Sequence, residues 1–310
     1  MKKILLWTLA TVLLVVFVPV LLKQLRPDPG RQYEAVSLDP TRYREIRFRN
    51  AVQDIDLAGM LYLPATEGPW PAAAVIHGSG TSSRSNRWYL SLAHYLQDHG
   101  IAVLLPDKRG SEQSGGDWRN ASFEDLATDT EAALDYLRQR DDLPLTRVGV
   151  IGMSQGGWIA PLVADRQPGV DYLVSVVGSA VSTHEQVLYE EVFNLEQLGV
   201  LPGLSNLLAR PANFLLFNFV QKDFWSAVGD FDPLPYWRRL SIPALALFGA
   251  EDSNVPSAES AARLRALDKP NIRVMIYDGS GHALQDPPGQ GDRLFRQDAL
   301  QAVCDFIDAR

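Results

Sequence analysis

The chain has a single cysteine, Cys304, among its 310 residues. One cysteine excludes a framework of internal disulfides, although it does not fix the cellular compartment. Basic residues are fewer than acidic ones, and the formal net charge is −8. Because nucleic-acid phosphates are bound by clustered lysine and arginine, this balance argues against a nucleic-acid partner. We therefore expect a small substrate that is neutral or weakly charged.

Motifs for metal and cofactor binding are also missing. The sequence has no HExxH, no paired CxxC and no carboxylate cluster at metal-ligand spacing. It also has no phosphate-binding loop of the GxxxxGK type and no GxGxxG. With 46% hydrophobic residues and no low-complexity tract, the chain predicts one large globular domain without a cofactor or a metal.

A long apolar run marks the N-terminus. Ile4 to Leu22 contains 19 residues without a charge. As a helix this run would span about 28 Å, close to the thickness of a bilayer's hydrocarbon core. A cleavable signal peptide usually has a shorter apolar core followed by small residues, and none follow here. Residues 1–25 therefore predict a transmembrane helix that anchors the chain, with secretion after signal cleavage as the alternative.

Residues 26–40 form a predicted linker, since Arg26 to Gly30 contains two prolines and a glycine. Positive charges flank the apolar run on both sides, which weakens the bias that sets membrane orientation. Lys2, Lys3 and the amino terminus favour an N-terminus on the cytoplasmic side. We thus expect the domain of residues 41–310 on the extracytoplasmic, periplasmic side of the membrane.

Apolar segments alternate with helix-period segments through this domain. Glu45 to Phe48 and Leu57 to Leu63 suit an antiparallel hairpin at the edge of a sheet. Between later apolar runs, Phe123 to Leu137 has helical periodicity with Ser122 as N-cap. The alternation predicts an α/β fold with a doubly wound, mostly parallel sheet of about eight strands. The short apolar runs expected to form the parallel strands are 72–76, 101–105, 148–151, 172–177, 244–248 and 273–277.

The segment Gly152-Met153-Ser154-Gln155-Gly156 lies between a predicted strand and a predicted helix. A sharp turn there would expose the Ser154 hydroxyl, and the flanking glycines would let neighbouring chain approach. A nucleophilic serine needs a base, and the base needs an acid that orients it. Asp252 and His282 follow two later strands, and parallel sheets gather their ligands at the carboxyl ends of strands. The pattern predicts Ser154 as nucleophile, His282 as base and Asp252 as acid.

This order of serine, aspartate and histidine, in these contexts, resembles the α/β-hydrolase family from about Asp54 to the C-terminus, apart from one insert. The resemblance implies an oxyanion hole in Val75 to Gly80, with the backbone N–H of Ser79 as one donor and that of Gln155 as the second. The match of Gly-x-x-Asp followed by Val-Pro favours Asp252 as the acid, with Glu251 and Asp278 as the alternatives.

Pro106 to Gly115 is similar to the family's D-x-R-G-x-G-x-S loop, with Glu112 where a glycine is common. This loop usually supports the site from beneath, so we expect Arg109 to be structural. His77, before the oxyanion loop, is likewise expected to support that loop. Residues 182–236 correspond to the position where the family carries a cap, and their bulky side chains suggest a helical cap insert that excludes water from the serine. His184 opens this cap and is a candidate pocket residue.

The resemblance implies a serine hydrolase that cleaves carboxylic esters through an acyl-serine intermediate. A peptidase or aminopeptidase and an acyl thioesterase use the same machinery and remain alternatives. A non-catalytic, membrane-tethered binding protein is the alternative of another class. We expect an apolar ester or acyl compound as substrate, and the membrane as a partner through the N-terminal helix. Since the base must be neutral, activity should fall below roughly pH 6 to 7.

Overall fold

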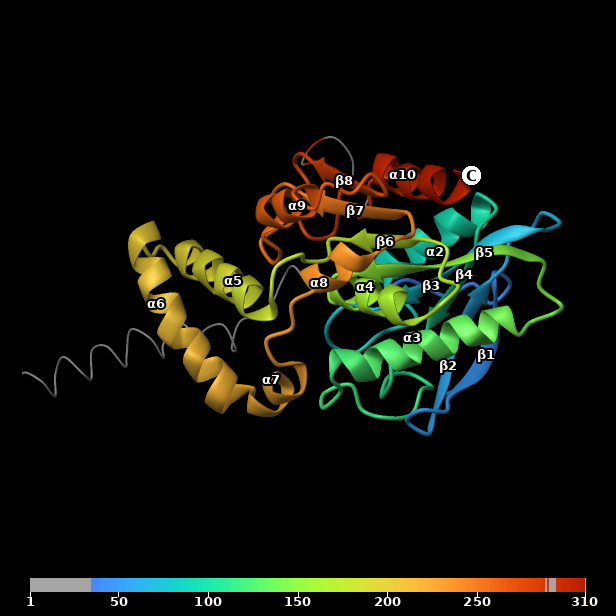
Figure 1. The fold of residues 1–310 in the computed structure, drawn as a ribbon, viewed down its shortest axis with the longest axis horizontal. Helices are drawn as coiled ribbons and strands as arrows, with labels where there is room; N and C mark the ends of the chain where they lie inside the picture. The colour runs from blue at the N-terminus through green and yellow to red at the C-terminus, as the bar shows by residue number, and fades with distance from the viewer. Residues whose placement is uncertain (1–34, 288, 290–293, 310) are drawn as a thin grey trace, which may run out of the picture.

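The computed structural model describes residues 35–287, 289 and 294–309 (Figure 1). The predicted anchor, residues 1–25, lies outside the described residues, as does the first part of the linker. Within the described residues, no helix has the length and apolar character needed to cross a membrane.

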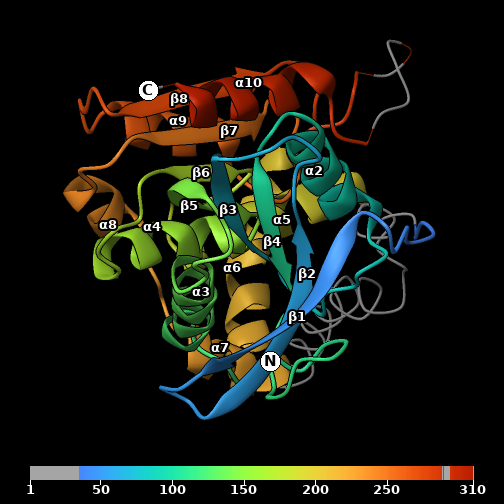
Figure 2. The same ribbon diagram turned by 90° about the vertical axis from the view of Figure 1, so that its right-hand side faces the viewer.

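An eight-stranded sheet runs through the molecule in the order β1-β2-β4-β3-β5-β6-β7-β8. The first two strands pair with each other antiparallel, β2 also pairs antiparallel with β4, and the remaining pairs are parallel. Figure 2 shows β1 and β8 at opposite edges of the sheet. The strands are β1 Tyr43–Asn50, β2 Ile55–Tyr62, β3 Trp70–Ile76, β4 Ala102–Pro106, β5 Leu145–Met153, β6 Leu173–Val176, β7 Ala244–Gly249 and β8 Ile272–Tyr277. The predicted α/β sheet, including its antiparallel entry hairpin, is confirmed.

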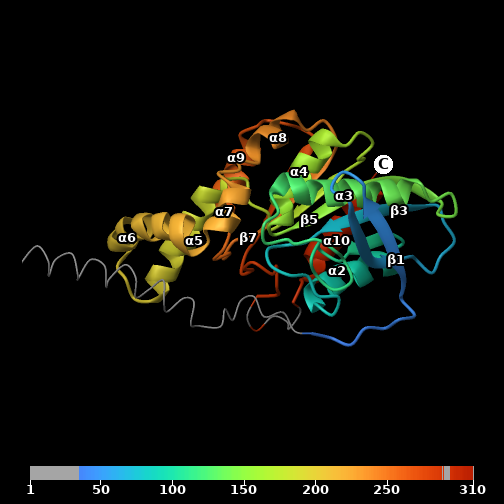
Figure 3. The ribbon, with the colours of Figure 1, turned by 90° about the horizontal axis from the view of Figure 1, so that it is seen from below.

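Helices cover both faces of the sheet, as Figure 3 shows. Buried side chains of α3, α4, α8 and α9 pack on one face, and those of α2 and α10 pack on the other. The central strands are therefore buried on both sides, which explains why their sequences are continuous apolar runs. The helices of the described chain are α2 Arg87–Asp98, α3 Phe123–Arg138, α4 Gly156–Arg166, α5 Thr183–Gln197, α6 Pro202–Leu215, the π-helix η1 Leu216–Val220, α7 Lys222–Val228, α8 Leu234–Arg239, α9 Ser257–Arg265 and α10 Gln297–Asp308.

Helices α5, α6 and α7 form a lobe at one end of the molecule (Figure 1). They follow β6 and precede β7, in the interval expected to form the cap. Phe224 and Trp225 pack against the core of the body, whereas Phe214 and Phe219 are exposed. The aromatic residues of this insert therefore divide between holding the lobe on the body and facing outward.

Candidate active site

Ser154 lies at the tip of a tight turn between β5 and α4. Its φ is 53°, in the left-handed region that serine seldom occupies. Its N–H donates to the carbonyl of Val176 at the end of β6, at 2.9 Å. The turn needs both neighbouring glycines, because a Cβ at Gly152 would lie 2.2 Å from the carbonyl oxygen of Gly156. A Cβ at Gly156 would lie equally close, 2.2 Å, to the carbonyl oxygen of Ile76. Sterics at this strand-to-helix junction therefore explain the spacing of the motif.

The structure brings the three predicted residues together. Nε2 of His282 is 2.9 Å from Oγ of Ser154, and Nδ1 of His282 is 2.8 Å from Oδ2 of Asp252. A carboxylate only accepts hydrogen bonds, so Nδ1 carries the proton and the Nε2 lone pair faces the serine hydroxyl. Oδ1 of Asp252 accepts the N–H groups of Asn254 and Val255 at 2.8 and 2.9 Å. Asp252 is thus fixed in place, and it in turn fixes the ring of His282.

Burial separates Asp252 from the two alternative acids. Its side chain has an exposed fraction of 0%, and that of His282 is 15%. Glu251 and Asp278 are both exposed, whereas His282 makes its hydrogen bond to Asp252. The geometry therefore favours Asp252 over its neighbours.

The predicted oxyanion donors lie beside the serine. Gly78 is close to it, since a Cβ at Gly78 would be 3.2 Å from the Cβ of Ser154. The N–H of Gly78 donates to the hydroxyl oxygen of Tyr89 at 2.8 Å, which fixes the loop just before Ser79. Among the described residues, no protein group accepts a hydrogen bond from the backbone N–H of Ser79 or Gln155. Both amides are therefore available to an incoming oxygen atom.

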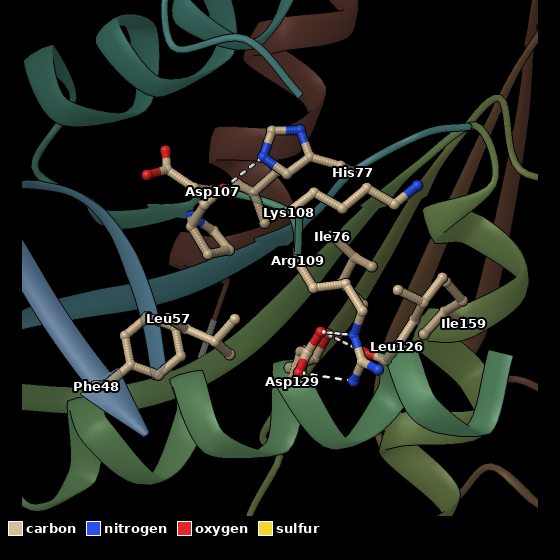
Figure 4. A pocket seen from close by; sticks show the side chains of 13 residues that line it. Phe48, Leu57, Ile76, His77, Asp107, Lys108, Arg109, Leu126, Asp129 and Ile159 are labelled. Carbon is tan, nitrogen blue, oxygen red and sulfur yellow. Dashed lines mark hydrogen bonds and ion pairs between the residues drawn. The ribbon is translucent and has the colours of Figure 1, made fainter. Parts of the chain in front are cut away.

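The loop after β4 is held beneath the site by buried ion pairs. Arg84 binds Asp107 at 2.8 Å, and Arg109 binds Asp129 of α3 at 2.6 Å. Figure 4 shows Arg109 turned down to Asp129 beside a cavity of ≈ 40 Å³. Ser154 and His282 do not line this cavity. The contacts of Arg109 suit the structural role expected for it.

His77 is buried at the end of β3, where its Nε2 donates to the carbonyl of Pro106 at 2.6 Å. Burial lowers the pKa of this imidazole to about 4, which keeps it neutral. Its ring packs against that of Tyr89, with the centroids 4.4 Å apart. His77 therefore joins the oxyanion loop to the strand next to it.

Known proteins share this architecture. Residues 69–222 match the family model described as "Serine aminopeptidase, S33". The chain is 26% identical over 249 residues to Esterase EstD of Thermotoga maritima, covering 76% of this chain and 59% of that protein. It is 25% identical over 251 residues to acyl-coenzyme A thioesterase 6 of Homo sapiens, covering 77% of this chain and 55% of the thioesterase. The solved structure of an esterase from Pyrococcus furiosus matches with a TM-score of 0.65 at 17% identity, covering 89% of this chain and 95% of the esterase.

The chain belongs to the α/β-hydrolase family. It spans a little over half the length of the two curated relatives. Within the described residues, no group of three or more His, Cys, Asp or Glu side chains is arranged to hold a metal ion.

Side chains of α5, α6 and η1 line a pocket of ≈ 390 Å³. His184, expected as a candidate pocket residue, lines it together with Leu188, Phe214 and Phe217. Arg210 supplies the cationic side chain of the lining. His184 also pairs with Asp230 at 3.0 Å.

Three residues at the site were not singled out from the sequence. Tyr89 anchors Gly78, and the Tyr189 hydroxyl on α5 donates to the backbone carbonyl of Asp252 at 2.7 Å, which links α5 to the loop that carries Asp252. Lys108 reaches the oxyanion loop from the loop after β4. Tyr89 lies 11 residues from its partner, whereas Lys108 lies 30 residues from Gly78 and Tyr189 lies 63 residues from Asp252. Only the position of Lys108 inside a family loop offered a signal.

Proposed function

We propose that this protein is a serine hydrolase that cleaves carboxylic esters through an acyl-serine intermediate. The observation that carries the proposal is the continuous hydrogen-bond chain from Asp252 through His282 to Ser154, with the serine on a strained turn. The similarity to two proteins named as esterases supports the choice of esters.

The geometry suits a two-step acyl transfer. Nε2 of His282 takes the hydroxyl proton of Ser154 while Oγ bonds to the ester carbonyl carbon. The carbonyl oxygen becomes an oxyanion, which the N–H groups of Ser79 and Gln155 stabilise. His282 then gives its proton to the departing alcohol, leaving an acyl-serine. Water repeats the sequence, releasing the acid and restoring the serine, while Asp252 stays ionised and orients the ring.

The names of the two curated relatives, an esterase and an acyl-coenzyme A thioesterase, support a small ester or acyl compound as substrate. The pocket of ≈ 390 Å³ is lined by neither Ser154 nor His282, so it does not define the acyl site.

Thioester hydrolysis is the second candidate, since the human relative is named as an acyl-coenzyme A thioesterase. Amide cleavage is the third, because the matching family model describes serine aminopeptidases. Both would use the same three residues.

A panel of chromogenic esters, acyl thioesters and aminoacyl amides separates these candidates, with Ser154→Ala as the matched control. We expect esters to be hydrolysed with the highest kcat/KM, and the variant to lose about 10⁶-fold in kcat. Turnover of the amides alone would overturn the ester assignment. Protein that is inert on every substrate and is not labelled by a fluorophosphonate would instead favour the binding-protein alternative.

We also propose that Ile4 to Leu22 anchors the enzyme in a membrane with its catalytic domain outside the cytoplasm. The charge-free length of this segment supports the proposal. Full-length protein should stay with membranes in high salt and leave them in detergent. Protease added outside spheroplasts should digest its domain. Recovery of the intact chain in the soluble fraction would contradict the anchor.

A further inference from the structure

Lys108 is a buried lysine that the proposed mechanism does not use. Its residue has an exposed fraction of 7%. Nζ donates to the carbonyl oxygen of Gly78 at 2.7 Å and to Oε1 of Gln155 at 2.9 Å. The ring of Trp118 lies 5.5 Å from the same nitrogen. In Figure 4 its side chain extends away from the pair formed by Arg109 and Asp129.

The two acceptors of Lys108 belong to the two segments that carry the oxyanion donors. The carbonyl of Gly78 and the N–H of Ser79 are parts of one peptide plane, and in a trans peptide they point in opposite directions. A hydrogen bond that fixes this carbonyl therefore also fixes the direction of the Ser79 N–H. Gln155 supplies the second N–H from its backbone, and its side chain is held by the same lysine.

A neighbouring contact restricts the preceding peptide group, which joins His77 to Gly78. Tyr89 accepts the N–H of Gly78, so both polar groups of Gly78 have side-chain partners. The backbone N–H of Lys108 itself donates to Oγ of Ser82 at 2.9 Å, which fixes the lysine at its base. Lys108 is therefore held at its backbone as well as at its amine, and its contacts restrict the movement of the oxyanion loop.

We propose that Lys108 is a positioning residue that holds the backbone N–H groups of Ser79 and Gln155 in the geometry needed to bind the oxyanion. This role rests on the proposed serine-hydrolase function. It extends that function by assigning a side chain to a site built from backbone groups.

A lysine suits this position because both partners are acceptors, and its charged ammonium group offers three donors and no acceptor. Burial lowers the pKa of Lys108 to about 7, and the carboxylate of Asp129 opposes that shift. The neutral amine keeps two N–H groups, one for each acceptor. The hydrogen bonds from Lys108 to Gly78 and Gln155 therefore do not depend on the protonation state of the lysine. They also require no change in the charge of His77 or Asp129, which are titratable groups nearby.

Lys108→Met tests the role, since methionine has a similar length and no donor. The measurements are kcat and KM on a short-chain p-nitrophenyl ester, and the inhibition constant of an alkyl trifluoromethyl ketone. This ketone adds to the serine and forms an oxyanion, so it reports on the oxyanion hole. We expect kcat to fall about 10- to 100-fold, KM to change less than about threefold, and ketone inhibition to weaken in parallel with kcat/KM.

Arg109→Met is the matched control, because Arg109 is the adjacent buried cation and binds Asp129 and Gln53 instead of the oxyanion loop. It should lower the unfolding temperature while leaving ketone inhibition within about threefold of the natural protein. If Lys108→Met keeps kcat and ketone inhibition within about threefold, or changes KM alone, the proposal is wrong.

Gln155→Met provides a second test that leaves Lys108 in place, and so remains informative if Lys108→Met does not fold. It should weaken ketone inhibition, and the double variant should lose less than the product of the two single effects. Multiplicative losses would reject the connection through Gln155. If the natural protein hydrolyses nothing and resists fluorophosphonate, the proposed function fails; if it is active and both variants match it, only the role of Lys108 fails.

Discussion

Ser154 holds its hydroxyl towards His282 by adopting a backbone conformation that costs free energy. A residue with a Cβ at a φ of 53° is strained by of order 1 to 3 kcal/mol relative to an ordinary conformation. The strain persists because β5, α4 and the carbonyl of Val176 fix the turn from both sides. The conformation that directs the Ser154 hydroxyl to His282 therefore also lowers the stability of the fold.

Replacing Ser154 with glycine should relieve this strain. Because glycine adopts positive φ without a Cβ penalty, we expect Ser154→Gly to raise the free energy of unfolding by about 1 kcal/mol relative to Ser154→Ala. Both variants lack the hydroxyl and should be inactive. Urea unfolding followed by tryptophan fluorescence measures the difference, and equal stability of the two variants would show that the turn is not strained.

The buried His77 should make stability depend on pH. Its pKa is lowered from 6.5 to about 4 in the folded protein, so between these values the unfolded chain binds more protons. Its contribution is complete above about pH 6.5 and is lost as the pH falls towards 4, by up to about 3 kcal/mol. His77→Asn removes the titration and keeps a donor for Pro106.

The free energies of unfolding of the natural protein and His77→Asn, measured from pH 7.5 to 4, test this linkage. The free energy of unfolding of the natural protein minus that of His77→Asn should decrease steadily as the pH falls. A difference that stays constant over the range would mean that His77 is not desolvated.

Sequence reasoning at the residue scale found the side chains whose type and spacing are diagnostic. Ser154, Asp252 and His282 each follow an apolar run, and parallel strands bring such positions to one edge. Lys108 and Tyr189 could not be found in this way, because lysine and tyrosine are common and their partners are distant in sequence. Their roles depend on which loops meet, and no local pattern encodes that.

Helix α3 begins after Ser122, the predicted N-cap, and the structure shows that Ser122 forms a capping box with Asp125. Oγ of Ser122 accepts the N–H of Asp125 at 3.1 Å, and the carboxylate of Asp125 accepts the N–H of Ser122 at 2.9 Å. These bonds satisfy backbone donors that a helix otherwise leaves without partners. Helix α3 also carries Asp129, the partner of Arg109. The stability of its first turn therefore affects the loop that carries Arg109.

Ser122→Ala should lower the free energy of unfolding by about 1 kcal/mol, because the alanine cannot accept the N–H of Asp125. Ser91→Ala on α2 is the matched control, since it makes the same chemical change within a helix, where Oγ only donates to the carbonyl of Arg87. That change should stay within about 0.5 kcal/mol. Thermal unfolding by circular dichroism measures both, and equal losses would argue against the cap.

The cap is the part of the fold that the sequence predicted least. The sequence located the insert, because residues 182–236 break the alternation of strands and helices. It did not predict where the helices of the insert begin and end. Helix α6 contains Pro211, and the chain continues into a π-helix at Leu216–Val220. Large apolar side chains also face outward there, as at Leu201 and Leu207. Periodicity assigns apolar residues to a buried face, so it cannot describe a helix that exposes them.

At the scale of the whole molecule, the number of strands could be read from the sequence, but their order could not. Each strand has a local signature, either an apolar run or an alternation of polar and apolar residues, whereas the exchange of β3 and β4 in the sheet depends on how the intervening segments cross it. Helices α2 and α10, which are far apart in the sequence, cover one face of the sheet and share one core.

Labelling of Cys304 tests whether α10 unfolds together with the rest of the domain. It is the one cysteine of the chain, it lies on α10 with an exposed fraction of 2%, and burial raises its pKa to about 12. Because thiolates are the reactive species, a thiol reagent at pH 8 should modify the native protein far more slowly than the unfolded protein. As urea increases, labelling should rise together with the loss of native tryptophan fluorescence. Labelling that is complete before the fluorescence changes would show that α10 separates from the sheet on its own.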